Sequence, residues 1–196
     1  MVGTRQFDED VVLGKALDLF WRKGFAATSM IDLARATGVQ RGSLYNAYGG
    51  KERLFLLAFE SYAGRFLDGA RRALAAPDPR KAVAAFFAAA IANMTGGSPS
   101  RGCLTTRTAT ETSRVGAAVE ARLRALLGDL ESLVRAALST DRARRALSTE
   151  PAAAADLVVT FTRGLAVMER VHGDRRRLQR SAARLVAVLF PAAPRR

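Results

Sequence analysis

Apolar residues recur at spacings of three and four along nearly the whole chain, and this periodicity constrains the fold more than any other feature. Ala and Leu are abundant, whereas patterns typical of strands are almost absent. The sequence therefore predicts an all-α protein. With 196 residues, the chain can bury a sizeable core without disulfides or metals, either as one large domain or as two small ones.

Capping residues and glycines divide the periodic pattern into separate helices. Asp8 is a suitable N-cap, and Ser29 forms a capping-box-like Ser-x-x-Asp arrangement with Asp32. Glycines at 24 and 38, a Gly pair at 49–50 and a Pro-Asp-Pro segment at 77–79 end helices. The predicted helices span about 8–23, 29–38, 40–47, 51–76, 80–95, 103–111, 115–138, 152–171 and 175–189.

The formal net charge of +13 suggests a polyanionic partner, but its distribution does not locate one. Residues 1–60 carry 8 Lys and Arg against 7 Asp and Glu, whereas residues 61–196 carry 23 against 11. Much of the excess is Arg in helices rich in Ala, Arg and Leu, where a solvated helix face is the simpler interpretation. Bulk charge therefore identifies no binding surface.

The sequence lacks the residue clusters that enzymes and metal sites need. Cys103 and His172 are the single cysteine and the single histidine, so no disulfide framework and no His/Cys cluster with metal-ligand spacing is possible. A Gly-rich phosphate loop and paired catalytic carboxylates are also absent. We therefore expect no metal, no cofactor and no enzymatic activity.

Membrane association is also not expected. No stretch approaches the roughly 20 apolar residues that a membrane-spanning helix requires. The first ten residues are polar and acidic, unlike a signal peptide. These observations predict a cytoplasmic protein without a membrane partner.

Residues 29–48 combine two short helices with a tight turn that contains Gly38, which is the helix-turn-helix pattern. The second helix of such a motif lies in the DNA major groove, so it needs one polar face and one apolar face. Leu44 is placed to pack against the other helices, and Gly42 lets the backbone approach DNA closely. The residues left for DNA are Gln40, Arg41, Ser43, Tyr45 and Asn46.

This region resembles the TetR/AcrR family of transcriptional regulators over about the first third of the chain. The matching pattern, which needs no insertion, is Ala16-Leu17-x-Leu19-Phe20-x-x-x-Gly24-Phe25-x-x-Thr28-Ser29-x-x-x-Leu33-Ala34-x-x-x-Gly38-Val39-x-x-Gly42-Ser43-Leu44-Tyr45-x-x-Tyr48-x-x-Lys51-x-x-Leu54. The resemblance implies a three-helix DNA-binding domain at residues 1–50 and a helical effector-binding and dimerisation domain at residues 51–196.

The resemblance also implies which residues contact the DNA backbone. Thr28 and Ser29 would anchor the second helix to phosphate, and Lys51 would neutralise a phosphate. Tyr45 and Tyr48 would contact the backbone from the recognition helix. For the two tyrosines a partly buried core position is the alternative.

Base contacts are assigned to Arg41, Ser43 and Asn46, because Arg suits guanine edges and Asn suits adenine edges. An ordinary surface charge is the alternative for Arg41. Gln40 and Gly50 stand where the family more often places a capping residue, so the helices that follow them should have weakened N-terminal caps.

In this family the last two helices pair with those of a second subunit. Here residues 152–171 and 175–189 would fill that role, with apolar residues at helical spacing: Leu157, Phe161, Leu165, Met168, Leu178, Leu185 and Leu189. Intrachain core is the alternative for each of them. For the pair of helices we expect a homodimer that binds a pseudo-palindromic DNA operator.

The region between these segments supplies material for an effector pocket. Its apolar candidates, for each of which ordinary core is the alternative, are Phe86, Phe87, Ile91, Met94, Leu104, Leu126, Leu130 and Phe161. Cys103 lies in a Gly-Cys-Leu sequence that resembles a subgroup whose cysteine senses electrophiles or oxidants, and a helix N-terminus and Arg101 would favour its thiolate. Buried packing is the alternative for this cysteine.

The sequence thus favours a repressor that a small apolar or electrophilic effector, or thiol modification, releases from its operator. Two other classes of protein fit the sequence less well. An enzyme is disfavoured by the missing catalytic residues, and an Arg-rich helical module that binds anionic surfaces without sequence preference does not account for the helix-turn-helix pattern.

Overall fold

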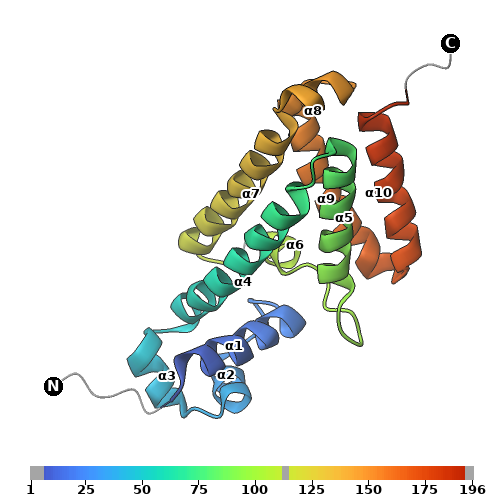
Figure 1. The fold of residues 1–196 in the computed structure, drawn as a ribbon. Coiled ribbons are helices and arrows are strands. Elements are labelled where there is room, and N and C mark those ends of the chain that lie inside the picture. Colours follow the sequence, from blue (N-terminus) through green and yellow to red (C-terminus); the bar gives the residue numbers. More distant parts are fainter. Residues whose placement is uncertain (1–6, 112–114, 193–196) are drawn as a thin grey trace. The chain divides into compact units, whose positions relative to one another are not determined.

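The structure is a computed structural model, and it describes residues 7–111 and 115–192 (Figure 1). The expectation that the chain begins without a signal peptide rests partly on residues 1–6, which lie outside the described residues. All regular structure in the described ranges is helical, which confirms the predicted fold class. The helices are α1 (Glu9–Lys23), α2 (Met30–Thr37), α3 (Arg41–Tyr48), α4 (Lys51–Leu74), α5 (Pro79–Thr95), α6 (Leu104–Ala109), α7 (Ala117–Leu138), α8 (Asp141–Ala146), α9 (Pro151–His172) and α10 (Arg175–Leu189).

The sequence pattern missed one helix and overestimated another. Helix α8 was not predicted because it is short and rich in Arg, so it shows little apolar periodicity. Its N-cap, Thr140, accepts a hydrogen bond from the amide of Ala143 at 3.2 Å. Helix α6 is shorter than the predicted 103–111 and leaves Cys103 just before its first turn.

The chain folds into two compact units. The first comprises the residues up to 65 together with 107–123, and the second comprises 66–106 together with the residues from 124 onward. Both α4 and α7 contribute to each unit. The sequence-based division at residue 50 concerned function, and it stays a prediction.

The core of the first unit is aromatic. Phe20 from α1 meets Phe55 from α4 edge to face, with ring centroids 5.1 Å apart, and Phe25 packs on Phe55 at 5.2 Å. Leu33 from α2 and Leu44 from α3 are completely buried. Helix α2 packs against both α1 and α3, so the recognition helix is fixed to the rest of the unit by apolar contacts.

In the second unit, α5 packs against α9 and α10 (Figure 1). Their shared core includes Phe86, Phe87 and Val158, and Cys103 belongs to the same cluster. Ser148 connects the segment before α9 to the end of α10, because its amide donates to the carbonyl of Leu189 at 2.9 Å. The helices that carry the predicted effector and dimer residues are therefore packed together.

Within the described residues, one helix, α9, is long and apolar enough to cross a membrane by length and composition. Core helices of soluble proteins pass the same test, and 44% of its most apolar window is buried inside this fold. Its length and composition are therefore weak support for a membrane span.

Gly24 ends α1 in a backbone conformation that only glycine adopts readily, with φ of 87° and ψ of 162°. A Cβ at this position would also collide with the carboxylate of Glu111, which belongs to the same unit. Gly38, at the end of α2, has a left-handed conformation as well, but a Cβ there would meet no atom within 4 Å. A substitution at Gly38 would therefore cause backbone strain alone, whereas one at Gly24 would cause strain and a steric collision.

We predict that Gly24→Ala destabilises the first unit more than Gly38→Ala does. The Gly38 variant should lose about 1–2 kcal/mol from left-handed strain alone, whereas the Gly24 variant adds displacement of Glu111. Urea unfolding followed by circular dichroism measures both. Equal losses of unfolding free energy in the two variants would contradict the packing of Glu111 against Gly24.

Candidate nucleic-acid interface

Helix α3 has one buried face and one exposed polar face. Leu44 and Tyr48 are buried, at 0% and 1% exposure. The opposite face is open to solvent and carries the residues predicted to read DNA, namely Gln40, Arg41, Gly42, Ser43, Tyr45 and Asn46. This division is what insertion of one helix face into a major groove requires.

The start of α3 has no side-chain cap. Gln40 occupies the N-cap position and makes no capping hydrogen bond, which confirms the weak cap inferred from the sequence. The end of the helix is closed instead by Gly49, which has a left-handed conformation and donates from its amide to the carbonyl of Tyr45 at 2.7 Å. The exposed side-chain amide of Gln40 therefore does not cap α3.

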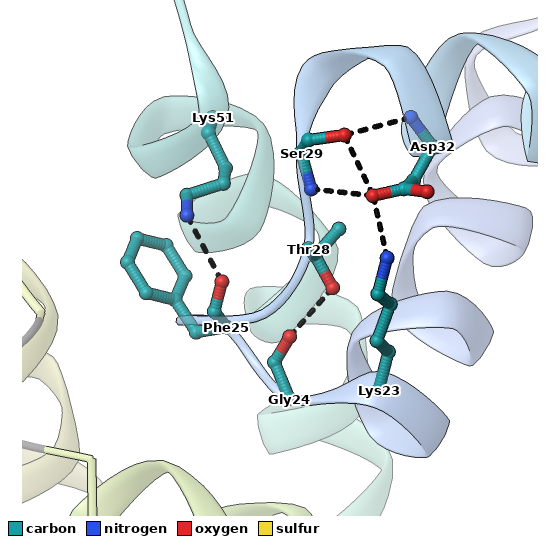
Figure 2. Close-up of polar contacts among 7 residues, drawn as sticks. All are labelled: Lys23, Gly24, Phe25, Thr28, Ser29, Asp32 and Lys51. Carbon is teal, nitrogen blue, oxygen red and sulfur yellow. Dashed lines mark hydrogen bonds and ion pairs between the residues drawn. The ribbon is translucent and has the colours of Figure 1, made fainter.

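Two residues expected at the DNA backbone have buried side chains. Thr28 is 1% exposed, and its hydroxyl donates to the carbonyl of Gly24 at 2.5 Å (Figure 2). Tyr48 is buried within the unit, with its ring 6.2 Å from that of Phe7. Both side chains pack the unit and do not face solvent, which is the alternative that the sequence left open for Tyr48, and a DNA contact by either residue stays a prediction.

Ser29 and Asp32 form the predicted capping box at the start of α2 (Figure 2). The amide of Asp32 donates to the Ser29 hydroxyl oxygen at 3.1 Å, and the amide of Ser29 donates to Asp32 Oδ2 at 2.9 Å. Lys23, from the last turn of α1, donates to the same Oδ2 at 2.7 Å. Hydrogen bonds from Lys23 and Ser29 hold the pKa of Asp32 well below its usual range.

Lys51 is half-buried and contacts the turn between α1 and α2. Its ammonium donates to the carbonyl of Phe25 at 3.0 Å and lies 4.4 Å from the centre of the Phe25 ring (Figure 2). The sequence placed this residue at a phosphate and did not predict the contact within the unit. One hydrogen bond leaves capacity for others, because an ammonium carries three donors.

A further contact with this turn was not visible in the sequence. Glu111 accepts a hydrogen bond from the amide of Ala26 at 2.8 Å, and Arg107 donates to the carbonyl of Trp21 at 3.4 Å. These partners lie 85 and 86 residues apart, and no local pattern marks either side chain. The turn at residues 24–28 is therefore held by its own Thr28 and by side chains from α4 and from the segment after α6.

The predicted effector residues lie in the second unit, where most of them are core. Phe161 is half-buried, with its ring 5.8 Å from that of Phe87, and the others are buried. Cys103 is 7% exposed, and a guanidinium nitrogen of Arg163 donates to its sulfur at 3.5 Å. Two shallow grooves are lined in part by predicted effector residues: Phe87 and Ile91 line one of about 230 Å³ between α5 and α10, and Phe161 lines one of about 210 Å³ between α9 and α10.

Comparison with known protein families assigns this architecture. Residues 12–58 match the bacterial regulatory proteins of the tetR family, and residues 79–185 match the tetracyclin repressor-like C-terminal domain. The matches cover more than half of the chain, which therefore belongs to the TetR family of DNA-binding transcriptional regulators. This family consists of regulatory proteins and not of enzymes.

Individual relatives agree with this assignment over a limited length. The chain is 45% identical over 60 residues to the transcriptional repressor ComR of Escherichia coli K12, and 42% identical over 59 residues to the uncharacterized regulator YezE of Bacillus subtilis 168. The alignments cover 31% and 30% of this chain, and only 29% and 30% of those two proteins.

Solved structures extend the similarity to nearly the whole chain. A cysteine mutant of the TetR family regulator CifR, in complex with a 26-base-pair double-stranded operator DNA, is 30% identical, with a TM-score of 0.83 over 95% of this chain and 99% of that one. The reduced form of NemR from E. coli has a TM-score of 0.84 at 18% identity, covering 94% and 98% of the two chains, and shows the shared fold.

We predict that the Lys23–Asp32–Ser29 network makes the first unit sensitive to acid. Because the folded pKa of Asp32 is depressed, the network stabilises the fold above the unfolded pKa of about 4 and loses this contribution as the pH falls below it. Asp32→Asn should therefore be less stable at pH 7, and its difference from the native chain should shrink between about pH 5 and pH 2.

Thermal unfolding monitored across this pH range measures the difference. Asp68→Asn, which removes an exposed ion pair with Arg71 within α4, is the matched control and should change stability little at any pH. A pH-independent difference for Asp32→Asn would show that its carboxylate charge does not stabilise the unit.

Proposed function

We propose that this chain is a sequence-specific repressor that binds a pseudo-palindromic DNA operator as a homodimer. Binding of an effector, or modification of Cys103, releases the repressor from the operator. The observation that carries the proposal is the exposed polar face of α3, presented by a helix whose opposite face is anchored through Leu44 and Tyr48. The operator complex of CifR supports DNA as the partner.

Specific side chains on that face would carry the sequence information. Arg41 and Asn46 are exposed and suit guanine and adenine edges, and Ser43 can bond to either. Tyr45, which is 46% exposed, and Ser29, which is exposed at the start of α2, would contact the DNA backbone. Lys51 donates one N–H to the carbonyl of Phe25, and its remaining ammonium N–H groups would contact a phosphate.

A homodimer is supported by an apolar stripe on the second unit. Along α9, Leu157, Phe161, Gly164, Met168 and Val171 follow one another at spacings of four and three, the repeat by which paired helices pack. Leu157, Met168 and Val171 remain 48%, 41% and 66% exposed, respectively. Leu165, Leu178 and Leu189, which the sequence placed in the dimer surface, are intrachain core.

The neighbouring helix continues this surface. On α10, Val188 is 67% exposed, and Arg177 and Ser181 line the groove between α9 and α10. A second copy of the chain, related to the first by a two-fold axis, would place its own α9 and α10 against these helices. It would cover this groove and bury the exposed stripe. The two recognition helices would then face two half-sites of one operator.

Binding of an effector is assigned to the second unit. The predicted pocket residues are packed in its core, so a ligand among Phe86, Met94 and Leu130 would have to separate helices that touch in this structure. Movement of that core would shift α6, because Cys103 comes directly before this helix. Arg107, four residues after Cys103, contacts the end of α1, so the shift would reach the first helix. A covalent group added to Cys103 would have the same effect.

We predict different effects for substitutions at two DNA-facing positions. Arg41→Ala should cost about 1–3 kcal/mol on the operator and relax the base preference. Lys51→Ala should weaken binding to all sequences similarly and lower the salt slope by about one. Titrations of operator duplexes with single base-pair changes, at several salt concentrations, distinguish these outcomes; unchanged base preference in Arg41→Ala would remove that residue from base recognition.

We predict that Val171→Glu converts the dimer into a monomer at micromolar concentration, because it buries an unpaired charge in the proposed interface. Sedimentation velocity measures the mass. Val11→Glu, at a comparably exposed valine on α1, is the control and should leave the dimer intact. A native chain that sediments as a monomer, or a dimeric Val171→Glu, would contradict the assignment of this surface.

A further inference from the structure

We propose that the space left beside Gly164 on α9 is a notch that receives the Met168 side chain of a second copy, so that this surface selects an identical chain as its partner. In a two-fold dimer the contact occurs twice, because each copy supplies one notch and one methionine. The inference rests on the proposed homodimer, and it names the pair of side chains that makes the contact selective.

Among the described residues, nothing in the chain itself accounts for a glycine at position 164. Gly164 lies in the middle of α9 and is exposed, and a Cβ built on it would meet no neighbouring atom within 4 Å. Glycine inside a helix is less favourable than alanine, because it loses more backbone freedom on folding. A partner that occupies the space of the missing side chain would account for it.

The notch belongs to a groove between α9 and α10, two helices that pack side by side (Figure 1). The groove has a volume of about 210 Å³, and Phe161, Leu165 and Leu178 supply apolar parts of its lining. Ser181, on α10, adds a second small side chain. An unbranched and flexible side chain such as that of methionine fills an irregular apolar groove well.

Met168 provides the complementary projection. It borders the same groove and is 41% exposed. It follows Gly164 by about one helical turn, so both residues lie on one face of α9. When Met168 of one copy enters the notch of the second, a two-fold axis brings Met168 of the second copy to the notch of the first. A surface that carries a notch and a projection one turn apart can therefore pair with itself.

The exposed part of α9 around the notch carries no charge. Between positions 157 and 168, the exposed residues are Leu157, Thr160, Gly164, Val167 and Met168. The chain has a formal net charge of +13, so two copies repel each other on average. A two-fold contact brings identical groups together, and an uncharged stripe avoids repulsion between like charges. The distribution of charge thus favours a second copy, and not an acidic partner, as the occupant.

Two variants that change opposite sides of the contact test it. Gly164→Leu fills the notch and keeps the methionine, whereas Met168→Ala keeps the notch and removes the methionine. Each variant alone should dimerise at least about tenfold more weakly than the native chain, because the first overpacks the interface and the second leaves a void. Sedimentation over a series of concentrations, without DNA, measures the dissociation constants.

A mixture of the two variants in equal amounts should recover dimers. In a mixed dimer, the methionine of the first variant enters the open notch of the second, and the introduced leucine faces the introduced alanine. Native mass spectrometry should therefore show more mixed dimer than random exchange of subunits gives. Gly128→Leu is the matched control, because Gly128 is an exposed glycine inside α7 whose Cβ would also meet no atom within 4 Å. It should leave the dissociation constant unchanged.

A native dissociation constant for Gly164→Leu, or a share of mixed dimer no higher than random exchange gives, would overturn the assignment. Circular dichroism spectra show whether each variant keeps its helices, so that loss of dimer is not mistaken for unfolding. If Val171→Glu separates the subunits but Gly164→Leu does not, the proposed dimer surface stands and the selective contact fails. A native chain that is monomeric at micromolar concentration would overturn both.

Discussion

The turn between α1 and α2 is held at its backbone by its own Thr28 and by side chains from two other parts of the first unit, and the presentation of α3 depends on that restraint. Thr28 bonds to the carbonyl of Gly24, Lys51 to that of Phe25, and Glu111 to the amide of Ala26. All three bonded groups belong to the backbone just after α1, and the carbonyl of Phe25 also accepts a hydrogen bond from the amide of Thr28 at 3.3 Å. Once the turn is fixed, α2 can pack on α1 and carry α3 with it.

The restraint explains why the polar face of α3 can be almost entirely free for DNA. The helix is eight residues long and lacks a side-chain cap, so its own sequence would not hold it in place. Leu44 and Tyr48 attach it to a core that α1, α2 and α4 have already fixed. The exposed residues then contribute little to folding and can differ between regulators that share this fold.

Helical periodicity and capping chemistry were sufficient to predict the fold from the sequence. They predicted the all-α class, nine of the ten helices in the described part of the chain and the capping box at Ser29, because these features depend on residues three or four positions apart. The contacts of Glu111, Arg163 and Glu169 could not be predicted, since their partners lie 60 to 85 residues away and depend on tertiary packing.

The candidate DNA site was predicted in part. The exposed positions of Gln40, Arg41 and Asn46 follow from their places on an amphipathic helix, and the structure shows them exposed. Thr28 and Tyr48 were assigned to DNA from the family pattern, but a pattern does not distinguish a residue that contacts DNA from one that packs the motif. In this structure both side chains are buried, and their contact with DNA stays a prediction.

Selection of bound duplexes from a random DNA pool by this chain tests whether two α3 helices read a symmetric operator. We expect one enriched sequence with dyad symmetry, whose two half-sites are separated by about one helical turn or a multiple of it, because two α3 helices must enter successive major grooves. Binding that enriches no sequence and depends only on salt would contradict it, and would instead identify the chain as a non-specific binder of polyanions.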